Sequence, residues 1–209
     1  MRLPLLIAPL LLSLVSSLHA AEPQALFDGK TLAGWEGDVQ MFRVEDEAIV
    51  AGTLDAKIPH NEFLCTTEEF GDFELRLQAK LLGQGRNAGV QFRSQRIPNH
   101  REVVGYQCDM GGTGKGLIWG ALYDESRRRT FLVEGDQAKL ADVVQRDDWN
   151  ELVIRCEGPR IQIWVNGYQT VDYTEADAAI PQRGIIALQI HSGPPSAAFY
   201  KDIRLQRLD

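Results

Sequence analysis

The chain has 209 residues, 24% of them charged, and a formal net charge of −7 at pH 7. Its densest basic run, Arg127–Arg129, closely follows Asp124 and Glu125, so the chain lacks the positive surface that nucleic acid attracts and we expect no nucleic-acid partner. Once an N-terminal leader is set aside, the length suits one domain with a sizeable core and is short for two.

The chain begins with the residue order of a secretory signal peptide. Arg2 supplies a charged start, an apolar run follows, and the small residue Ala20 closes it. The run is shorter than the roughly 20 residues of a membrane-spanning helix, so we expect no membrane insertion. The sequence therefore predicts a signal peptide at residues 1–20, one domain at residues 21–209, and a periplasmic or secreted location. No sequence feature indicates an oligomeric state.

Short alternating runs separated by dense turn signals follow the leader, a pattern typical of an all-β protein. The strictest alternation lies in Phe73–Leu81, and Asn166 with Gly167 predicts a two-residue hairpin. The expected strands are, in chain order, Gln40–Val44, Ala48–Ala51, Phe63–Thr66, Phe73–Leu81, Ala88–Arg93, Gly105–Met110, Trp149–Glu157, Ile161–Val165, Tyr168–Tyr173, Gly184–His191 and Ala197–Leu205.

Helix signals are few. Only Gln137–Leu140 and Thr174–Ala179 are candidates, and both are short. A single sheet with so many strands would curl or split, so the sequence predicts two antiparallel sheets packed face to face, an all-β sandwich.

The three cysteines, Cys65, Cys108 and Cys156, are odd in number and show no Cys-x-x-Cys spacing. This pattern indicates neither a zinc ribbon nor a dense disulfide framework. Because Cys65 and Cys156 have apolar neighbours in strand-like segments, we expect buried, reduced thiols.

Three of the expected strands carry two polar residues that are two positions apart in an otherwise apolar pattern. These pairs are Gln91 and Arg93, Gln107 and Asp109, and Gln189 and His191. Side chains alternate between the faces of a strand, so each pair points away from the core that its apolar neighbours enter. If the strands share one face, that face is a candidate site for a sugar or another polar substrate.

The segment Leu26–Trp35 resembles the Leu-Phe-Asn/Asp-Gly-Lys-x-Leu-x-Gly-Trp start of the 3-keto-disaccharide hydrolase family, formerly a domain of unknown function in exported bacterial proteins. Further segments that resemble the family follow in order and cover nearly the whole mature chain: Phe70–Leu75, Asn87–Ser94, Gly105–Gln107, Trp149–Asn150, Ile163–Gly167, Gly184–His191 and Phe199–Leu205. The resemblance implies a jelly-roll sandwich of the concanavalin A and laminin-G type, with a concave sheet that holds carbohydrate. In function it implies cleavage of glycosides whose sugar is oxidised at C3.

One departure from the family pattern falls within a polar pair. The family commonly reads Gly-Tyr-Glu-Val-Gln on this strand, whereas residues 105–109 read Gly-Tyr-Gln-Cys-Asp. The carboxylate has moved two residues along the same strand face, from the position of Gln107 to that of Asp109.

The implied reaction needs a base for the C2 proton, a donor or cation at the C3 oxygen, and an acid for the leaving oxygen. We assign Asp109 and His191 as base and acid, in either order, and Arg93 as the stabiliser of negative charge. The amides Gln107 and Gln189, together with Gln91, are expected to orient substrate hydroxyl groups.

Two mechanistic alternatives remain open. A direct hydrolysis would use Asp109 and Glu125 as a carboxyl pair. A divalent metal ion could stabilise the enolate, with Asp109, Glu125 and His191 as ligands, but the chain has no metal-binding histidine spacing. We therefore assign no metal site and no cofactor.

Residues around 119–128 supply further candidate substrate contacts. Trp119 lies in a glycine-rich stretch where its ring could stack on a pyranose, and Tyr123, Glu125 and Arg128 follow. The competing interpretation for Arg128 is a solvated loop with local ion pairs.

Two functions of other classes compete with an enzyme that acts on 3-keto-glycosides. One is a non-catalytic, lectin-like carbohydrate-binding module, and the other is a cell-surface adhesion or scaffold domain, because fold alone does not define function. A lectin needs aromatic and amide groups, whereas an enzyme needs an acid and a base within reach of one substrate.

Overall fold

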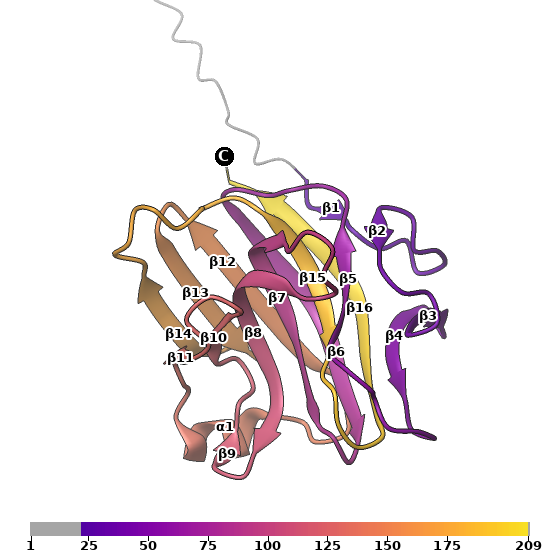
Figure 1. Ribbon diagram of the computed structural model, residues 1–209. Helices are drawn as coiled ribbons and strands as arrows, with labels where there is room; N and C mark the ends of the chain where they lie inside the picture. Colours follow the sequence, from indigo (N-terminus) through magenta and orange to yellow (C-terminus); the bar gives the residue numbers. More distant parts are fainter. Residues whose placement is uncertain (1–21, 209) are drawn as a thin grey trace, which may run out of the picture.

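The computed structural model describes residues 22–208 (Figure 1). The expected signal peptide at residues 1–20 lies outside the described residues. Across residues 22–208, no helix combines the length and apolar character that a membrane crossing requires.

Two antiparallel sheets pack face to face, which confirms the predicted all-β sandwich (Figure 1). The first sheet has the order β14-β13-β12-β6-β16-β4-β3, and β1 pairs with β16. Its strands are β1 (Gln24–Ala25), β3 (Phe42–Glu45), β4 (Ala48–Thr53), β6 (Phe73–Gly83), β12 (Asn150–Glu157), β13 (Arg160–Val165), β14 (Tyr168–Thr174) and β16 (Ser196–Arg207).

The second sheet has the order β11-β10-β8-β7-β15-β5-β2, and β9 pairs with β8. Its strands are β2 (Trp35–Glu36), β5 (Glu62–Thr66), β7 (Asn87–Arg96), β8 (Val103–Thr113), β9 (Gly116–Leu117), β10 (Leu122–Glu125), β11 (Phe131–Val133) and β15 (Ile185–Ile190). This sheet faces the viewer in Figure 1 and presents one face to the first sheet and the other outward.

The core forms between the inward faces of the two sheets, as the period-two alternation predicts. On β6, Phe73, Leu75 and Leu77 are at most 2% exposed, while the residues between them are half-buried or exposed. Strand β6 pairs with β12 on one side and β16 on the other, so its apolar face lies at the centre of the first sheet.

The helix predictions had different outcomes. Helix α1 (Gln137–Val143) begins after Asp136, whose side chain accepts a hydrogen bond from the backbone N–H of Lys139 at 2.9 Å. The prediction of a helix at Thr174–Ala179 is wrong. The backbone N–H of Glu175 donates to the backbone oxygen of Pro159, which extends the chain past β14. The Asp177 side chain then holds a turn by accepting a hydrogen bond from the backbone N–H of Ala179.

All three cysteines are free and buried, as expected. Burial raises the pKa of the Cys65 thiol to about 11 and that of Cys156 to about 12. These thiols are therefore protonated side chains of the interior.

Candidate functional site

The strands that carry the three polar pairs are neighbours in the second sheet, in the order β8-β7-β15. In the register of these strands, Gln91 lies opposite Gln107 on one side and opposite Ala187 on the other, and Gln189 lies opposite Gly89. The apolar alternates of the same strands enter the core between the sheets, namely Val90, Cys108 and Leu188. The polar residues Gln91, Gln107 and Gln189 therefore share the outward face.

A chain of hydrogen bonds crosses this face and ends on a carboxyl group. The Ser94 hydroxyl donates to Gln91 Oε1 at 2.8 Å, and Gln91 Nε2 donates to Gln107 Oε1 at 2.7 Å. Gln107 Nε2 then donates to Asp109 Oδ1 in a short contact. All four side chains are at most 4% exposed. Because each amide both donates and accepts, the chain fixes the orientation of both glutamines and directs an N–H at Asp109.

Two glycines make room for this chain. A Cβ atom at Gly89 would lie 2.6 Å from Cδ of Gln107, and one at Gly105 would lie 2.3 Å from Oγ of Ser94. Either side chain would overlap the hydrogen-bonded group beside it. The glycines therefore allow the polar side chains to lie flat on the sheet.

Among residues 22–208, no cationic side chain pairs with Asp109. Burial raises the pKa of its carboxyl group to about 8, the hydrogen bond from Gln107 opposes the shift, and the charge of Glu125 adds to it. A carboxyl group with this pKa exchanges its proton near neutral pH, so it can act as an acid or as a base.

Strand β10 brings Tyr123 and Glu125 to the same face. In its pairing with β8, Tyr123 lies opposite Gln107 and Glu125 lies opposite Gly105. The Gln189 side chain reaches Glu125, with Nε2 at 3.5 Å from Oε2. The structure thus places the two carboxyl groups predicted as a candidate pair in one polar cluster, which we call the Asp109 cluster: Gln91, Gln107, Asp109, Tyr123, Glu125 and Gln189.

The electrostatics of Glu125 and Tyr123 reflect this proximity. Burial raises the pKa of Glu125, the Glu102 carboxylate raises it further, and the backbone N–H of Ser126 and the His191 side chain oppose the shift. Burial also raises the pKa of the Tyr123 phenol, and the charges of Glu125 and Asp109 reinforce that shift. Tyr123 therefore stays protonated and can donate a hydrogen bond.

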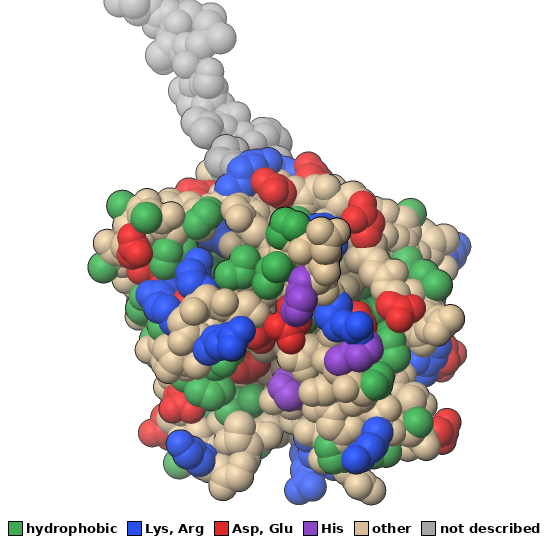
Figure 2. Space-filling view, viewed as in Figure 1, with side chains coloured by type: hydrophobic (Ala, Val, Ile, Leu, Met, Phe, Trp, Pro, Cys, Tyr) green, Lys and Arg blue, Asp and Glu red, His purple; other side chains and the backbone are tan. Residues whose placement is uncertain are grey.

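His191 follows β15 directly and borders the Asp109 cluster. Its ring Nδ1 lies 2.7 Å from the backbone oxygen of Ser192, and its backbone N–H donates to Asn87 at 3.2 Å. The side chain is half-buried and interacts favourably with Glu125. Figure 2 shows histidine and acidic side chains gathered around a hollow on this face of the molecule.

Arg93 does not join the Asp109 cluster, so the prediction that it converges there is wrong. A β-bulge follows Phe92, and Arg93 adopts a positive φ of 46° that turns its side chain away from the outward face. Its side chain is 1% exposed and pairs with Asp72 at 2.7 Å. It also donates to the backbone oxygens of Gly71 and Gly158, at 3.1 and 2.6 Å. Arg93 thus cross-links two loops.

Two further expected substrate contacts lie elsewhere. Trp119 is 6% exposed and packs in the core, so its ring is not presented to a sugar on the outward face. Arg128 forms ion pairs with Asp124, in a short contact, and with Glu175 at 2.6 Å. Arg128 therefore forms local ion pairs, as the competing interpretation predicted, and its guanidinium group lies outside the Asp109 cluster.

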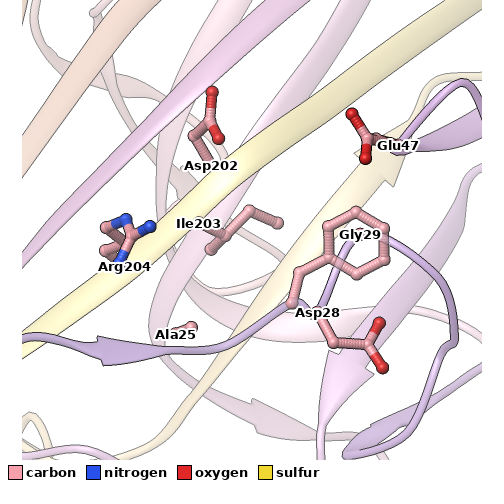
Figure 3. Close-up of a pocket in the computed structure, with 8 residues that line it drawn as sticks. Ala25, Asp28, Gly29, Glu47, Asp202, Ile203 and Arg204 are labelled. Atoms are coloured by element: carbon pink, nitrogen blue, oxygen red, sulfur yellow. The ribbon is translucent and has the colours of Figure 1, made fainter.

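A separate small cavity of about 210 Å³ lies in the first sheet where β1 meets β16 (Figure 3). Its acidic side chains do not converge: Asp28 points away from Glu47 and Asp202 in Figure 3. The Asp28 carboxylate already accepts hydrogen bonds from the backbone of Lys30 and Thr31 at 2.8 and 2.7 Å. This cavity lacks the convergent polar groups of the Asp109 cluster.

The sequence left open a metal site formed by Asp109, Glu125 and His191. Among residues 22–208, no group of three or more histidine, cysteine, aspartate or glutamate side chains is arranged to hold a metal ion.

Sequence reasoning missed the groups that support the cluster. Ser94 donates to Gln91, Gly89 makes room for Gln107, and Glu102 raises the pKa of Glu125. None of the three was a candidate. A glycine inside an apolar strand pattern is a recognised signal of close approach by another group, so Gly89 could have been found. Glu102 carried no comparable signal, because it lies in a polar loop.

Solved structures with the same architecture include a candidate glycosyl hydrolase from Parabacteroides distasonis ATCC 8503, at 19% identity and a TM-score of 0.64, which covers 90% of this chain and 94% of that one. The carbohydrate-binding module CBM66 from Bacillus subtilis has 14% identity and a TM-score of 0.62, with 83% and 95% covered. The exoplasmic/lumenal domain of VIP36, in its Ca²⁺/Man3GlcNAc-bound form, has 12% identity and a TM-score of 0.61, with 88% and 87% covered. At these identities the likeness concerns the fold.

Among curated proteins, no sequence matches the chain. The family match is extensive by contrast and confirms the resemblance seen in the sequence motifs. It supports a function related to carbohydrate. Residues 22–206 match the family described as the 3-keto-alpha-glucoside-1,2-lyase-like domain, and the chain belongs to that family.

Proposed function

We propose that this protein is an exported enzyme that cleaves 3-keto-glycosides at the Asp109 cluster, by elimination followed by addition of water. The family supplies the substrate class. The single observation that carries the catalytic role is the buried Asp109 carboxyl group, whose pKa is raised to about 8 with a second carboxyl group, Glu125, in electrostatic contact. Carboxyl pairs with shifted pKa values are typical of acid and base catalysts.

The chemistry follows from the ketone at C3, which acidifies the proton on C2. A base removes this proton, and the electron pair forms an enolate with its charge on the C3 oxygen. When the ketone re-forms, a C1–C2 double bond forms and the bond from C1 to the leaving oxygen breaks. Water then adds at C1 and a proton returns to C2, so the net reaction is hydrolysis.

Asp109 fits the base in this scheme. A base removes a proton most effectively when its pKa is close to the working pH, and the carboxylate of an exposed aspartate is a far weaker base than a group with a pKa of about 8. Glu125 and His191 fit the acid side, because they interact favourably and Glu125 itself has a raised pKa. Protonation of the leaving oxygen is the role we give them.

We assign Tyr123, in place of Arg93, as the hydrogen-bond donor to the enolate oxygen. The Arg93 side chain is committed to Asp72 and to two backbone oxygens. Tyr123 lies opposite Gln107 on the outward face, and its raised pKa keeps the phenol protonated. A protonated phenol can stabilise a developing oxyanion by a hydrogen bond.

The substrate class is tested by incubating the protein with methyl 3-keto-glucoside and with its unoxidised parent, each with and without a chelator. We expect methanol release from the keto substrate alone, with a transient ultraviolet absorbance from the conjugated enone. Cleavage of both substrates would contradict the role of the ketone. Cleavage of neither by the folded protein would favour the binding module.

A carbohydrate-binding module is the second candidate. The observation that favours it is the hydrogen-bonded run of amides on the outward face, since amides suit hydroxyl recognition. The same face also holds Asp109 and Glu125, and a pure binding site gains nothing from two carboxyl groups with raised pKa values. Equal affinity for a keto sugar and its parent, without turnover, would support the module.

A further inference from the structure

A cavity of about 470 Å³ lies on the outward face of the second sheet, beside the Asp109 cluster. The loop at residues 97–102, which joins β7 to β8, forms one wall, and the end of β2 with the two residues after it (residues 36–38) forms another. The floor is apolar. It contains Phe63, Cys65 and Val103, which belong to a small apolar group, separate from the main core, that also includes Ile185 and Ala187.

This cavity continues the same sheet face by one strand. Phe63 lies opposite Gln189 and Cys65 lies opposite Ala187 in the pairing of β5 with β15. Ala187 in turn lies opposite Gln91 in the pairing of β15 with β7. The apolar floor and the polar cluster are therefore adjacent regions of one surface.

The cavity and the acid side of the cluster also share a residue. Glu102 lines the cavity, and its Oε2 accepts a hydrogen bond from the Ser126 hydroxyl at 3.2 Å. Ser126 immediately follows Glu125, and its backbone N–H donates to Glu125 Oε1 at 3.2 Å. A group bound in the cavity would thus lie next to the residue that we expect to protonate a leaving oxygen.

Two ion pairs lie at the rim of the cavity. Arg96 lies 2.9 Å from Glu36, and Arg101 lies 3.2 Å from Glu62. Asp38 and Glu102 also line the cavity, so carboxyl groups outnumber arginines there. This excess of negative charge disfavours an anionic occupant, and the cavity suits a neutral one. An apolar face can rest on Phe63, while hydroxyl or ether oxygens meet the polar rim.

We propose that this cavity holds the leaving group of the glycoside and selects a neutral, ring-sized group with an apolar face. This inference rests on the proposed function. On this proposal the Asp109 cluster holds the oxidised sugar, and the neighbouring cavity, with its apolar floor and polar rim, receives the group on C1. Both a cycloalkyl ring and a second sugar ring have the required shape.

The experiment compares kcat/KM for three 3-keto-glucosides with methyl, cyclohexyl and glucosyl leaving groups. Methanol and cyclohexanol have similar acidity, so a difference between these two substrates reports binding. A sugar hydroxyl is more acidic, so for the glucosyl substrate the cavity variants below separate binding from leaving-group acidity. We expect at least one ring substrate to exceed the methyl substrate by about tenfold, corresponding to about 1.4 kcal/mol. A preference for cyclohexyl identifies the apolar floor as the source, and a preference for glucosyl alone identifies the polar rim.

Variants at the cavity test whether the leaving group binds there. His100 is exposed and lines the cavity, so His100→Trp should add bulk without disturbing the core. Arg101→Ala removes part of the rim. Each variant should reduce the ratio of ring to methyl kcat/KM towards one. The matched control is Arg160→Ala, which removes an exposed, ion-paired arginine from the first sheet and should leave the ratio unchanged.

The outcomes separate the two proposals. Turnover of the methyl substrate with no advantage for either ring would overturn the leaving-group cavity and retain the proposed function. A ring advantage that survives both cavity variants, each with an unaltered Tm, would also overturn it. Absence of turnover with all three substrates would overturn the proposed function and this inference with it.

Discussion

Asp109 on β8 and Asp124 on β10 belong to neighbouring strands of the second sheet and are similarly buried, at 4% and 0% exposed. Their partners differ. Asp124 pairs with Arg127 at 2.8 Å and with Arg128 in a short contact. Asp109 accepts a hydrogen bond from the neutral amide of Gln107 and faces the negative charge of Glu125.

The comparison shows how partners decide what a buried carboxyl group can do. The arginines around Asp124 compensate its charge, and Arg128 extends the network to Glu175, which also accepts from the Tyr106 hydroxyl at 2.5 Å. That network fixes the hairpin that carries Tyr123 and Glu125. In the described part of the chain no cation compensates Asp109, and burial raises its pKa to about 8. It can therefore exchange a proton near neutral pH.

The largest effect is expected from Asp109→Asn. Removing the base should lower kcat/KM for a 3-keto-glucoside by about 10²–10⁴-fold, the usual contribution of a general base. The amide has the same shape and no charge to desolvate, so the free energy of unfolding should not fall. Steady-state kinetics and denaturant unfolding measure the two quantities. Unchanged turnover would remove the central residue from both proposed mechanisms.

The converse change is Asp124→Asn. It leaves Arg127 and Arg128 without their shared carboxylate and should lower the free energy of unfolding by about 3 kcal/mol, the lower end for a broken buried pair, because the arginine side chains are 23% and 33% exposed. Denaturant unfolding checks this value. An unchanged free energy of unfolding in Asp124→Asn would contradict the structural role given to Asp124, because the two aspartates would then differ little.

The raised pKa of Asp109 also makes the stability of the protein depend on pH. The folded-state pKa of Asp109 is raised to about 8, above its usual value of 3.8, so the folded state binds more protons than the unfolded chain between these values. This residue's contribution to stability is therefore greatest below about pH 4 and is lost as the pH rises through about 8. The difference in free energy of unfolding between the protein and Asp109→Asn should change across pH 5 to 9. A constant difference would contradict the raised pKa.

A smaller effect is expected from Gly89→Ala. The new Cβ would lie 2.6 Å from Cδ of Gln107 and should displace that amide from Asp109. Because the Gln107 hydrogen bond lowers the Asp109 pKa, its loss should move the pH–rate profile to higher pH, with a stability loss of about 1–3 kcal/mol from overpacking. Gly114→Ala is the matched control, since a Cβ there meets nothing within 4 Å. An unshifted profile in Gly89→Ala would separate Gln107 from the titration of Asp109.

Alternation along the strands made much of this site predictable. Gln107, Asp109 and Gln189 could be placed on one face because their strands keep the period of two through β8 and β15. The same rule failed for Arg93, because a bulge after Phe92 interrupts the period, and single-sequence patterns do not reveal a bulge.

The rest of the site depends on contacts between residues that are distant in sequence. The pairing of Arg128 with Glu175 links two hairpins and could not be read from the run of arginines alone. Trp119 lies among glycines as a loop residue would, yet the chain returns it to the core. Strand β10 was not expected, because its acidic residues have low strand propensity and its stability comes from pairing with β8.

Elimination begins with removal of the C2 proton, and turnover of methyl 3-keto-glucoside in D₂O reports this step. If Asp109 removes this proton before C1 loses its substituent, the released 3-keto-glucose should carry deuterium at C2, and Asp109→Asn should form little of it. The same sugar incubated without protein gives the background exchange. Release of methanol with hydrogen retained at C2 would contradict elimination and favour direct hydrolysis by Asp109 and Glu125.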